Sequence, residues 1–301
     1  MACIGCQVPQ ADTSGSQSLA DTGAPPQRPD AEYGLSEQRL SVDGEPRDYE
    51  LYVPESYSHD QAAPVVLNFH GGGGSARSQR AVSDMRSLAE THNFLLVYPE
   101  GTLLENGSTH WNPLPPGAEG KSDANDFGFI AALIDELSSR YQIDPLRVYA
   151  TGYSNGAGMA YGLACYLSDR IAAIAPVSGS MYAQMQTDCP ASHPTGVAIF
   201  NGTQDAQRPY DGFPGWFLSV DDAATFWASH NQTAASPQID ELRDSGRVIE
   251  RTRYGSDGEA QVVKHKVMGG GHEWFDLNLD GANLDETIWS FFAQHDRDGG
   301  R

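Results

Sequence analysis

Residues 147–160 read RVYATGYSNGAGMA, and this stretch decides the fold that we expect. It begins as a short β-rich run, turns through Gly152-Tyr153-Ser154-Asn155-Gly156, and continues into small residues that favour a helix. A G-x-S-x-G pentapeptide between a strand and a helix is typical of a nucleophile elbow, whose strained turn lifts the serine hydroxyl clear of the sheet. The flanking glycines avoid side chains that would collide with the turn. We therefore predict that Ser154 is a nucleophile and that the Asn155 backbone N–H is a donor to an oxyanion.

Strand-like and helix-like segments alternate along the rest of the chain. Strands are expected at 38–42, 49–53, 64–69, 94–98, 148–151, 171–176, 196–200, 248–254 and 261–267, and helices at 78–92, 126–141, 220–229 and 283–295, besides the helix after Ser154. This alternation predicts an α/β fold with a doubly wound, mainly parallel sheet and helices on both faces. Residues 33–301 are expected to form one catalytic domain. Residues 1–32 contain almost no large apolar side chain and are predicted to be a disordered tether.

A base and an acid for the serine are expected later in the chain. A serine hydroxyl is a weak nucleophile until a histidine removes its proton, and a carboxylate must orient that histidine. Asp205 and His272 each follow a predicted strand, and His272 lies on a triple-glycine loop. The order serine, acid, histidine is the one expected on this type of sheet. We predict the triad Ser154, Asp205 and His272. Three other carboxylates compete with Asp205 for the role of acid, but none immediately follows a strand: Asp211, Asp221 and Asp222.

The glycine run at 71–75 follows another buried strand and is predicted to supply a second oxyanion donor. Glycines let a backbone N–H approach the substrate oxygen without a Cβ in the way, and we assign this donor to Gly72. His70, at the start of the run, is expected to brace the loop. A phosphate-binding loop is the competing interpretation, but the Lys-Ser/Thr pair of that motif is missing.

The composition excludes several classes of partner. The chain has 301 residues and a formal charge of −21, so it should repel nucleic acid and anionic membrane surfaces. No uninterrupted apolar run approaches the roughly 18–20 residues that a membrane-spanning helix needs.

Four cysteines bear on the cellular compartment. Cys165 and Cys189 flank a predicted strand and could form a disulfide or remain two buried thiols. No cluster of histidines or further cysteines accompanies Cys3 and Cys6, which disfavours zinc. The residues before Cys6 resemble the end of a bacterial lipoprotein signal, so Cys6 is a candidate lipid anchor. The alternative is an arbitrary start with incidental cysteines.

These motifs together resemble the secreted polyhydroxybutyrate depolymerase and feruloyl esterase group, α/β-hydrolases related to carbohydrate esterase family 1. The segments that carry the resemblance are His70-Gly71-Gly72, Phe127-Gly128-Phe129-Ile130, Ile143-Asp144-Pro145, Gly152-Tyr153-Ser154-Asn155-Gly156, Gly202-Thr203-Gln204-Asp205 and Gly270-Gly271-His272-Glu273-Trp274. The resemblance covers roughly residues 38–295. It implies the triad named above and a Cys165–Cys189 disulfide. Two departures are Asn201, where histidine is common, and Phe127, where a small aliphatic residue is usual; neither touches the triad.

The function that these observations predict is that of a serine carboxylic-ester hydrolase, secreted or attached to the surface of a bacterium. It would act through an acyl-enzyme without a metal or organic cofactor. The resemblance implies a feruloyl or acetyl-xylan ester, or a polyester of the polyhydroxybutyrate type, as substrate. The alternatives are a catalytically silent binding lipoprotein on the same fold and a serine peptidase.

Two further features concern ligands. Four aromatic residues are candidates for walls of an acyl cleft, although any one of them could instead pack in the core: Trp111, Tyr153, Trp216 and Trp274. Residues 276–287 resemble the first half of a calcium loop, but position 12 is Thr287 where a glutamate is expected. An ordinary helix start at Asn283 is the favoured interpretation of that segment.

Overall fold

The computed structural model describes residues 1–2, 31–118, 122–233 and 236–301. The predictions of a disordered tether at 1–32 and of a lipid anchor at Cys6 therefore fall almost wholly outside the described residues.

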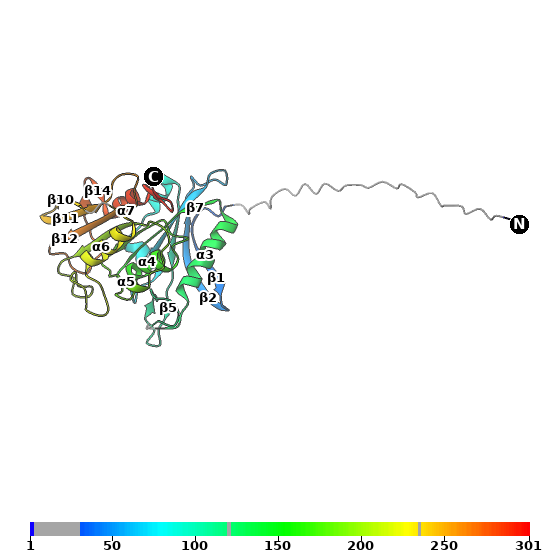
Figure 1. Cartoon of the computed structure of the whole chain (residues 1–301), viewed down its shortest axis with the longest axis horizontal. Coiled ribbons are helices and arrows are strands. Elements are labelled where there is room, and N and C mark those ends of the chain that lie inside the picture. Colours follow the sequence, from blue (N-terminus) through cyan, green and yellow to red (C-terminus); the bar gives the residue numbers. More distant parts are fainter. Residues whose placement is uncertain (3–30, 119–121, 234–235) are drawn as a thin grey trace.

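A ten-stranded sheet forms the centre of the protein (Figure 1). Its strands, in spatial order, are β1 (Gly34–Val42), β2 (Glu45–Val53), β4 (Leu95–Pro99), β3 (Ala63–Phe69), β7 (Ile143–Tyr153), β8 (Ala173–Val177), β9 (Gly196–Gly202), β12 (Val262–Val267), β11 (Arg247–Tyr254) and β10 (Gln238–Asp244). The six strands from β4 to β12 are parallel, and the two strands at each edge pair antiparallel. Three two-residue ladders lie outside this sheet: β5 (Thr102–Leu103) with β6 (Thr109–His110), β13 (Asn278–Leu279) with β14 (Ala282–Asn283), and β15 (His295–Asp296) with β16 (Gly299–Gly300).

Helices pack on both faces of the sheet, as predicted. The helices are α1 (Ala76–Val82), α2 (Arg86–His92), α3 (Asp126–Arg140), α4 (Asn155–Tyr166), α5 (Met185–Asp188), α6 (Val220–His230) and α7 (Leu284–Phe292). Side chains of α3, α4 and α6 contribute to one buried cluster, whereas side chains of α1, α2 and α7 contribute to the other. This arrangement is the α/β-hydrolase fold.

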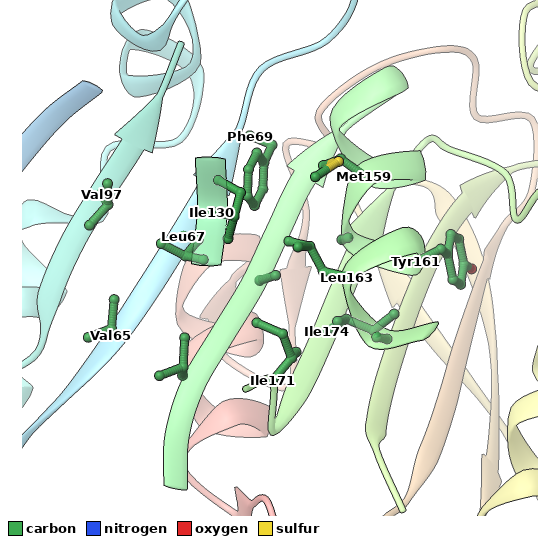
Figure 2. Close-up of a cluster of buried hydrophobic side chains, with 14 of the residues drawn as sticks. Val65, Leu67, Phe69, Val97, Ile130, Met159, Tyr161, Leu163, Ile171 and Ile174 are labelled. Atoms are coloured by element: carbon green, nitrogen blue, oxygen red, sulfur yellow. The ribbon is translucent and has the colours of Figure 1, made fainter. Parts of the chain in front are cut away.

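Strand β3 shows why two clusters form. All seven of its residues are buried, and successive side chains of a strand point to opposite faces. Leu67 and Phe69 face the first cluster, in which they meet Ile130 of α3 and Met159 of α4 (Figure 2). Val66 belongs to the second cluster. Each such fully buried aliphatic side chain contributes about 1.5–3 kcal/mol relative to an exposed one, so the central strands anchor the loops that follow them.

One predicted helix is wrong in its extent. Residues 78–92 form two helices, α1 and α2, because the chain breaks at 83–85. The hydroxyl of the buried Tyr98 donates to the Ser83 carbonyl at 2.6 Å and accepts from the Met85 N–H at 3.3 Å. A side chain from a neighbouring strand thus satisfies backbone groups that a continuous helix would otherwise bond internally.

The hairpins at the two edges of the sheet use the same kind of turn. Asp43 and Gly44 between β1 and β2, and Ser245 and Gly246 between β11 and its partner β10, all have positive φ. That backbone matches the twist of two antiparallel strands. Strand β10 was not predicted because its sequence, QIDELRD, is mostly charged and shows no buried face.

The parallel strands place the residues of interest at one edge of the sheet. Strands β3, β7, β9 and β12 are parallel to one another, and their carboxyl ends lead into residues 70–75, Ser154, Asp205 and His272. Ligands of open α/β sheets bind at this edge. No helix within the described residues is both long and apolar enough to cross a membrane.

Candidate active site

Ser154 lies at the turn between β7 and α4 in a backbone conformation that is unusual for a residue with a side chain. Its φ is 56° and its ψ is −111°. A Cβ added to Gly152 would lie 2.7 Å from the Gly156 carbonyl carbon, and one added to Gly156 would lie 2.4 Å from the Phe69 carbonyl oxygen. Both glycines therefore allow the first turn of α4 to approach the end of β3 closely. The strain at Ser154 is of the kind that clusters at functional sites.

Ser154, His272 and Asp205 form one chain of hydrogen bonds. The Ser154 Oγ lies 2.9 Å from His272 Nε2, and His272 Nδ1 lies 2.7 Å from Asp205 Oδ2. The other carboxylate oxygen, Oδ1, accepts the backbone N–H groups of Gln207 and Arg208, each at 2.8 Å. The Asp205 side chain is fully buried. These three side chains therefore have the geometry in which an oriented imidazole can take a proton from a serine.

The pKa of Asp205 lies below its ordinary value. Burial alone would raise the pKa of this carboxyl. The hydrogen bonds from His272 and from the two backbone N–H groups stabilise the charged form and outweigh burial. Asp205 therefore remains a carboxylate that can stabilise a cationic imidazole.

The loop that carries His272 is fixed at two points by hydroxyl groups. Tyr153 donates its hydroxyl to the His272 carbonyl at 2.8 Å, and Ser178 donates to the Glu273 carbonyl at 2.6 Å. The Tyr153 ring also lies 4.9 Å from the His272 ring, centroid to centroid. Both donors come from residues at the carboxyl ends of β7 and β8, so the sheet itself positions the histidine.

Gly72 and Asn155, whose backbone N–H groups are the predicted oxyanion donors, lie close to each other beside the serine. Gly72 is exposed, and a Cβ added to it would lie 3.7 Å from the Asn155 Cβ. The Gly72 N–H has no hydrogen-bond partner within the described residues. Asn155 is the first residue of α4, and an N–H at that position has no acceptor inside the helix. The pair can therefore bind an oxygen atom that carries negative charge.

The buried residue Trp111 corrects one prediction. Its side chain is 0% exposed, so it cannot form a wall that a substrate touches. Its indole N–H donates to the His70 carbonyl at 3.0 Å. Its backbone N–H donates to Asn155 Oδ1 at 2.8 Å, and its backbone carbonyl accepts from Asn155 Nδ2 at 3.1 Å. Trp111 therefore ties the loop at 101–124 to the segment before Gly72.

His70 braces this region as expected. Its Nδ1 lies 2.7 Å from the Gly71 carbonyl, and its Nε2 accepts the Gly101 N–H at 2.9 Å. Burial lowers the pKa of His70 to about 4. The imidazole is therefore neutral at pH 7, and its Nε2, 3.5 Å from Glu100, forms no ion pair.

The other predicted aromatic residues differ in their surroundings. Trp274 is half-buried and packs against the cluster between the sheet and α7, and its role as a wall of an acyl cleft stays a prediction. Tyr153 is half-buried beside Gly71 and Ser154. Trp216 is 52% exposed and lines a cavity of about 290 Å³. Of the three tryptophans predicted to line a cleft, Trp216 is the one that lines this cavity.

Sequence reasoning missed most of that cavity. Its remaining polar and aromatic walls include Tyr182, Arg208 and Phe217. The Tyr182 and Phe217 rings lie 5.0 Å apart, edge to face. A signal for it was present in the aromatic residues at 213–217, which follow Asp205 and of which only Trp216 was chosen as a candidate.

The competing carboxylates have other partners. Asp221 pairs with Lys264 and accepts the Tyr210 hydroxyl. Asp222 accepts the hydroxyl of Ser219, the N-cap of α6. Asp211 is exposed. None of these three carboxylates is bonded to His272.

The two departures from the family pattern lie in the core. Asn201 is fully buried on β9 and donates to the Gly179 carbonyl at 3.0 Å. Phe127 packs against Tyr166, with ring centroids 5.5 Å apart. Neither residue contacts the triad.

The cysteines in the body of the chain, Cys165 and Cys189, form a disulfide.

The segment at 276–287 is occupied by structural contacts. Asn283 and Glu286 form a capping box at the start of α7. Asp280 pairs with Arg251 at 2.6 Å. Across the described residues, no group of three or more histidine, cysteine, aspartate or glutamate side chains is arranged to hold a metal ion.

Comparison with known proteins places the chain among esterases. The family described as esterase PHB depolymerase matches residues 47–238. Feruloyl esterase B of Piromyces equi is 28% identical over 229 residues, which are 73% of this chain and 41% of that protein. Poly(3-hydroxyalkanoate) depolymerase C of Paucimonas lemoignei is 34% identical over 122 residues, 40% of this chain and 28% of that protein. This chain thus spans less than half the length of either relative.

A solved structure shares the fold. The acetyl xylan esterase from Aspergillus awamori superposes with a TM-score of 0.62 at 17% identity, covering 86% of this chain and 99% of that one. At this identity the likeness establishes the fold.

Proposed function

The chain belongs to the esterase PHB depolymerase family, and on that premise we propose that it is a serine carboxylic-ester hydrolase. The observation that carries the proposal is the hydrogen-bonded chain Ser154–His272–Asp205. Beside it lie the backbone N–H groups of Gly72 and Asn155, for which the described residues supply no acceptor. Each element of acyl transfer has a candidate there: a nucleophile, an oriented base, a buried carboxylate and donors for an oxyanion.

In the first half of the reaction, Ser154 attacks the ester carbonyl while His272 Nε2 takes the hydroxyl proton. The negative charge that develops on the carbonyl oxygen is held by the N–H groups of Gly72 and Asn155. Removing one such donor typically costs 10²–10³ in kcat, so this pair accounts for a large part of the expected acceleration. Asp205 holds the proton on Nδ1 and stabilises the imidazolium.

In the second half, the proton returns to the alcohol oxygen and the alcohol leaves. Water then enters, His272 removes its proton, and the acyl group departs as a carboxylic acid with Ser154 restored. Every proton transfer uses His272. The residues named in these two steps complete the chemistry by themselves.

The substrate class that we propose is either a plant-wall phenolic or acetyl ester, or a polyester of hydroxyacids. The names of the relatives support both. The cavity beside the triad favours an apolar or aromatic group, because its walls include Tyr182, Trp216, Phe217 and the segment Pro113-Leu114-Pro115-Pro116. Aromatic and proline surfaces bind such groups by burial of apolar area.

The test compares initial rates on methyl ferulate and on a 3-hydroxybutyrate oligomer. Ser154→Ala is the control and should lower kcat by several orders of magnitude. Preference for methyl ferulate would assign the chain to phenolic esters, and preference for the oligomer would assign it to polyesters. Hydrolysis that survives Ser154→Ala would refute the nucleophile. Folded protein without activity on either ester would favour the silent binding protein, and cleavage of peptides alone would favour the peptidase.

We also propose that the protein works outside the cytoplasm. The Cys165–Cys189 disulfide supports this, because such bonds persist in oxidising compartments. Attachment through a lipid on Cys6 is the finer version of the proposal. Mass spectrometry of the N-terminal peptide from the native host tests it: an unmodified Cys6 in membrane-associated protein would contradict it.

A further inference from the structure

The cavity of about 290 Å³ lies beside the triad without including it. Its walls come from residues within 110–118 and 122–124, from Tyr182, and from the loop that follows Asp205. The lining residues are His110, Asn112, Pro113, Leu114, Pro115, Pro116, Gly117, Ala118, Ser122, Ala124, Tyr182, Arg208, Trp216 and Phe217. Most of these side chains are apolar or aromatic, and Arg208 is the one cation with a permanent charge among them.

Two wall residues connect the cavity to the reacting groups. The Tyr182 ring approaches Gly158, whose added Cβ would lie 3.3 Å from that ring. Gly158 is one helical turn beyond Ser154, to whose carbonyl its N–H is bonded at 3.1 Å. On the other side, the backbone N–H of Arg208 is bonded to the carboxylate of Asp205. The cavity is therefore separated from Ser154 by Tyr182 and the first turn of α4 on one side, and from Asp205 by Arg208 on the other.

The Arg208 guanidinium has no carboxylate partner within the described part of the chain. Its central carbon lies 4.8 Å from the centroid of the Phe217 ring. Its Nη1 donates to the carbonyl of the adjacent Gln207 at 3.3 Å. Most other arginines that the structure describes pair with carboxylates; Arg47, for example, lies 2.7 Å from Asp126.

An arginine held in this way is ready to bind an anion. Stacking on an aromatic ring leaves the edge of the guanidinium, with its N–H groups, free to donate. The chain as a whole carries a charge of −21, so its field opposes the approach of anionic groups. A substrate with a negative charge therefore needs a local cation, and the cavity supplies one that no carboxylate of the described residues neutralises.

We propose that Arg208 binds a carboxylate carried by the ester substrate, on either its acyl or its alcohol part. The inference rests on the proposed esterase function and narrows its substrates to esters with a free acid group. An oligomer of hydroxyacids carries such a group at one end. A phenolic acid linked to a sugar through its carboxyl group does not, unless the sugar part is itself acidic. Arg208 thus distinguishes esters that carry a free acid group from esters that do not.

The kinetic test uses two matched pairs of esters. The first pair is 4-acetoxybenzoate and the neutral 4-acetoxybenzamide, which differ on the alcohol side. The second is the 4-nitrophenyl monoester of glutaric acid and that of glutaric acid monoamide, which differ on the acyl side. The quantity measured is the ratio of kcat/KM for the anionic ester to kcat/KM for its neutral partner. The pair that responds identifies the side on which the carboxylate lies.

Arg208→Gln should lower that ratio by about 10–100-fold for one pair, the range expected for a hydrogen-bonded charge pair. Arg208→Lys keeps the positive charge but loses the planar guanidinium, so its ratio should lie between those of the wild type and Arg208→Gln. Arg243→Gln is the matched control, because it removes one positive charge from an exposed site on β10, and it should leave both ratios unchanged. An equal loss on both members of each pair would overturn the proposal and assign Arg208 to support of Asp205.

A binding measurement separates this proposal from the esterase function. Calorimetry with the Ser154→Ala variant, carried out on both pairs, should detect tighter binding of the anionic ester than of its neutral partner in at least one pair. The additional change Arg208→Gln should abolish that difference. If the wild-type protein hydrolyses no ester but this difference is present, the esterase proposal fails and the anion site stands. Equal binding of the anionic and the neutral ester in both pairs would refute the anion site whether or not the protein is an esterase.

Discussion

Replacing Asp205 with asparagine tests the active site most sharply, because the structure fixes how the new side chain must lie. The Asp205 Oδ1 accepts two backbone N–H groups, those of Gln207 and Arg208, each at 2.8 Å. An asparagine can satisfy both only with its amide oxygen in that position. Its NH₂ group then faces His272 Nδ1, which must accept rather than donate. The imidazole proton moves to Nε2, where the histidine can no longer take a proton from Ser154.

The expected loss of kcat follows from the free-energy cost of turning the asparagine amide to the opposite orientation. To keep the productive tautomer, the amide must turn its NH₂ toward the two backbone N–H groups. Each of these part-buried N–H groups costs about 1–3 kcal/mol when it is left without an acceptor, so the productive arrangement lies about 2–6 kcal/mol above the unproductive one. At 1.36 kcal/mol for each factor of ten, kcat should fall by between about 30-fold and 10⁴-fold. Loss of the imidazolium's carboxylate partner places the expectation toward the upper end.

The assay is kcat on a soluble aryl ester, with urea unfolding to show that the variant is folded. Asp211→Asn is the matched control, because Asp211 is an exposed carboxylate on the loop that follows Asp205, and its rate should stay within about twofold of wild type. The reasoning is refuted if Asp205→Asn keeps more than a tenth of the wild-type kcat. A large loss in Asp211→Asn would instead show that the acid had been assigned to the wrong carboxylate.

Three other outcomes follow from the structure. Gly156→Ala places a Cβ 2.4 Å from the Phe69 carbonyl oxygen. The change should lower the free energy of unfolding, measured with urea, by about 1–3 kcal/mol or more, and it should lower kcat at least tenfold. A normal free energy of unfolding together with a normal kcat would contradict the close approach. Burial raises the pKa of Asp285 to about 6 from 3.8, so the folded state binds the extra proton and stability should fall as the pH rises through that interval. Asp285→Asn should remove up to about 3 kcal/mol of the decrease between pH 4 and pH 7.5, and identical pH profiles would count against the shift. Replacing Cys165 and Cys189 together with alanine should lower the free energy of unfolding by about 3–4 kcal/mol, and an unchanged Tm would argue that the thiols are not linked.

The residues of the triad could be found in the sequence because each one has a local signal. Ser154 lies between two glycines that its strained turn requires. Asp205 follows a strand whose sequence, GVAIFNG, is mostly apolar, and His272 lies on a triple-glycine loop after the strand VVKHKV. In a parallel sheet these strand ends meet at one edge, so order along the chain was enough to predict that the three side chains come together.

The lining of the cavity could not be found in this way. Trp111 and Trp216 both lie in long loops with similar composition, yet one is 0% exposed and the other 52%. The difference in exposure depends on partners that are distant in sequence. Trp111 is held in the interior by hydrogen bonds to the His70 carbonyl and to the Asn155 side-chain amide. The break between α1 and α2 has the same origin, because the hydroxyl that interrupts the helix belongs to Tyr98, on a strand that follows it.

Asn155 connects the candidate oxyanion site, which the sequence predicts, with the loop of Trp111, whose position the sequence does not predict. The backbone N–H of this residue would serve the oxyanion with almost any side chain, so acyl transfer alone does not require asparagine. Its side-chain amide, however, holds the backbone of Trp111 through two hydrogen bonds, and Trp111 holds the His70 carbonyl just before Gly72. The loop that walls the cavity is therefore attached to both oxyanion donors. Because the same bonds hold the cavity wall and the candidate oxyanion site, we expect a substitution of the Asn155 side chain to change both the preference for substrates and kcat.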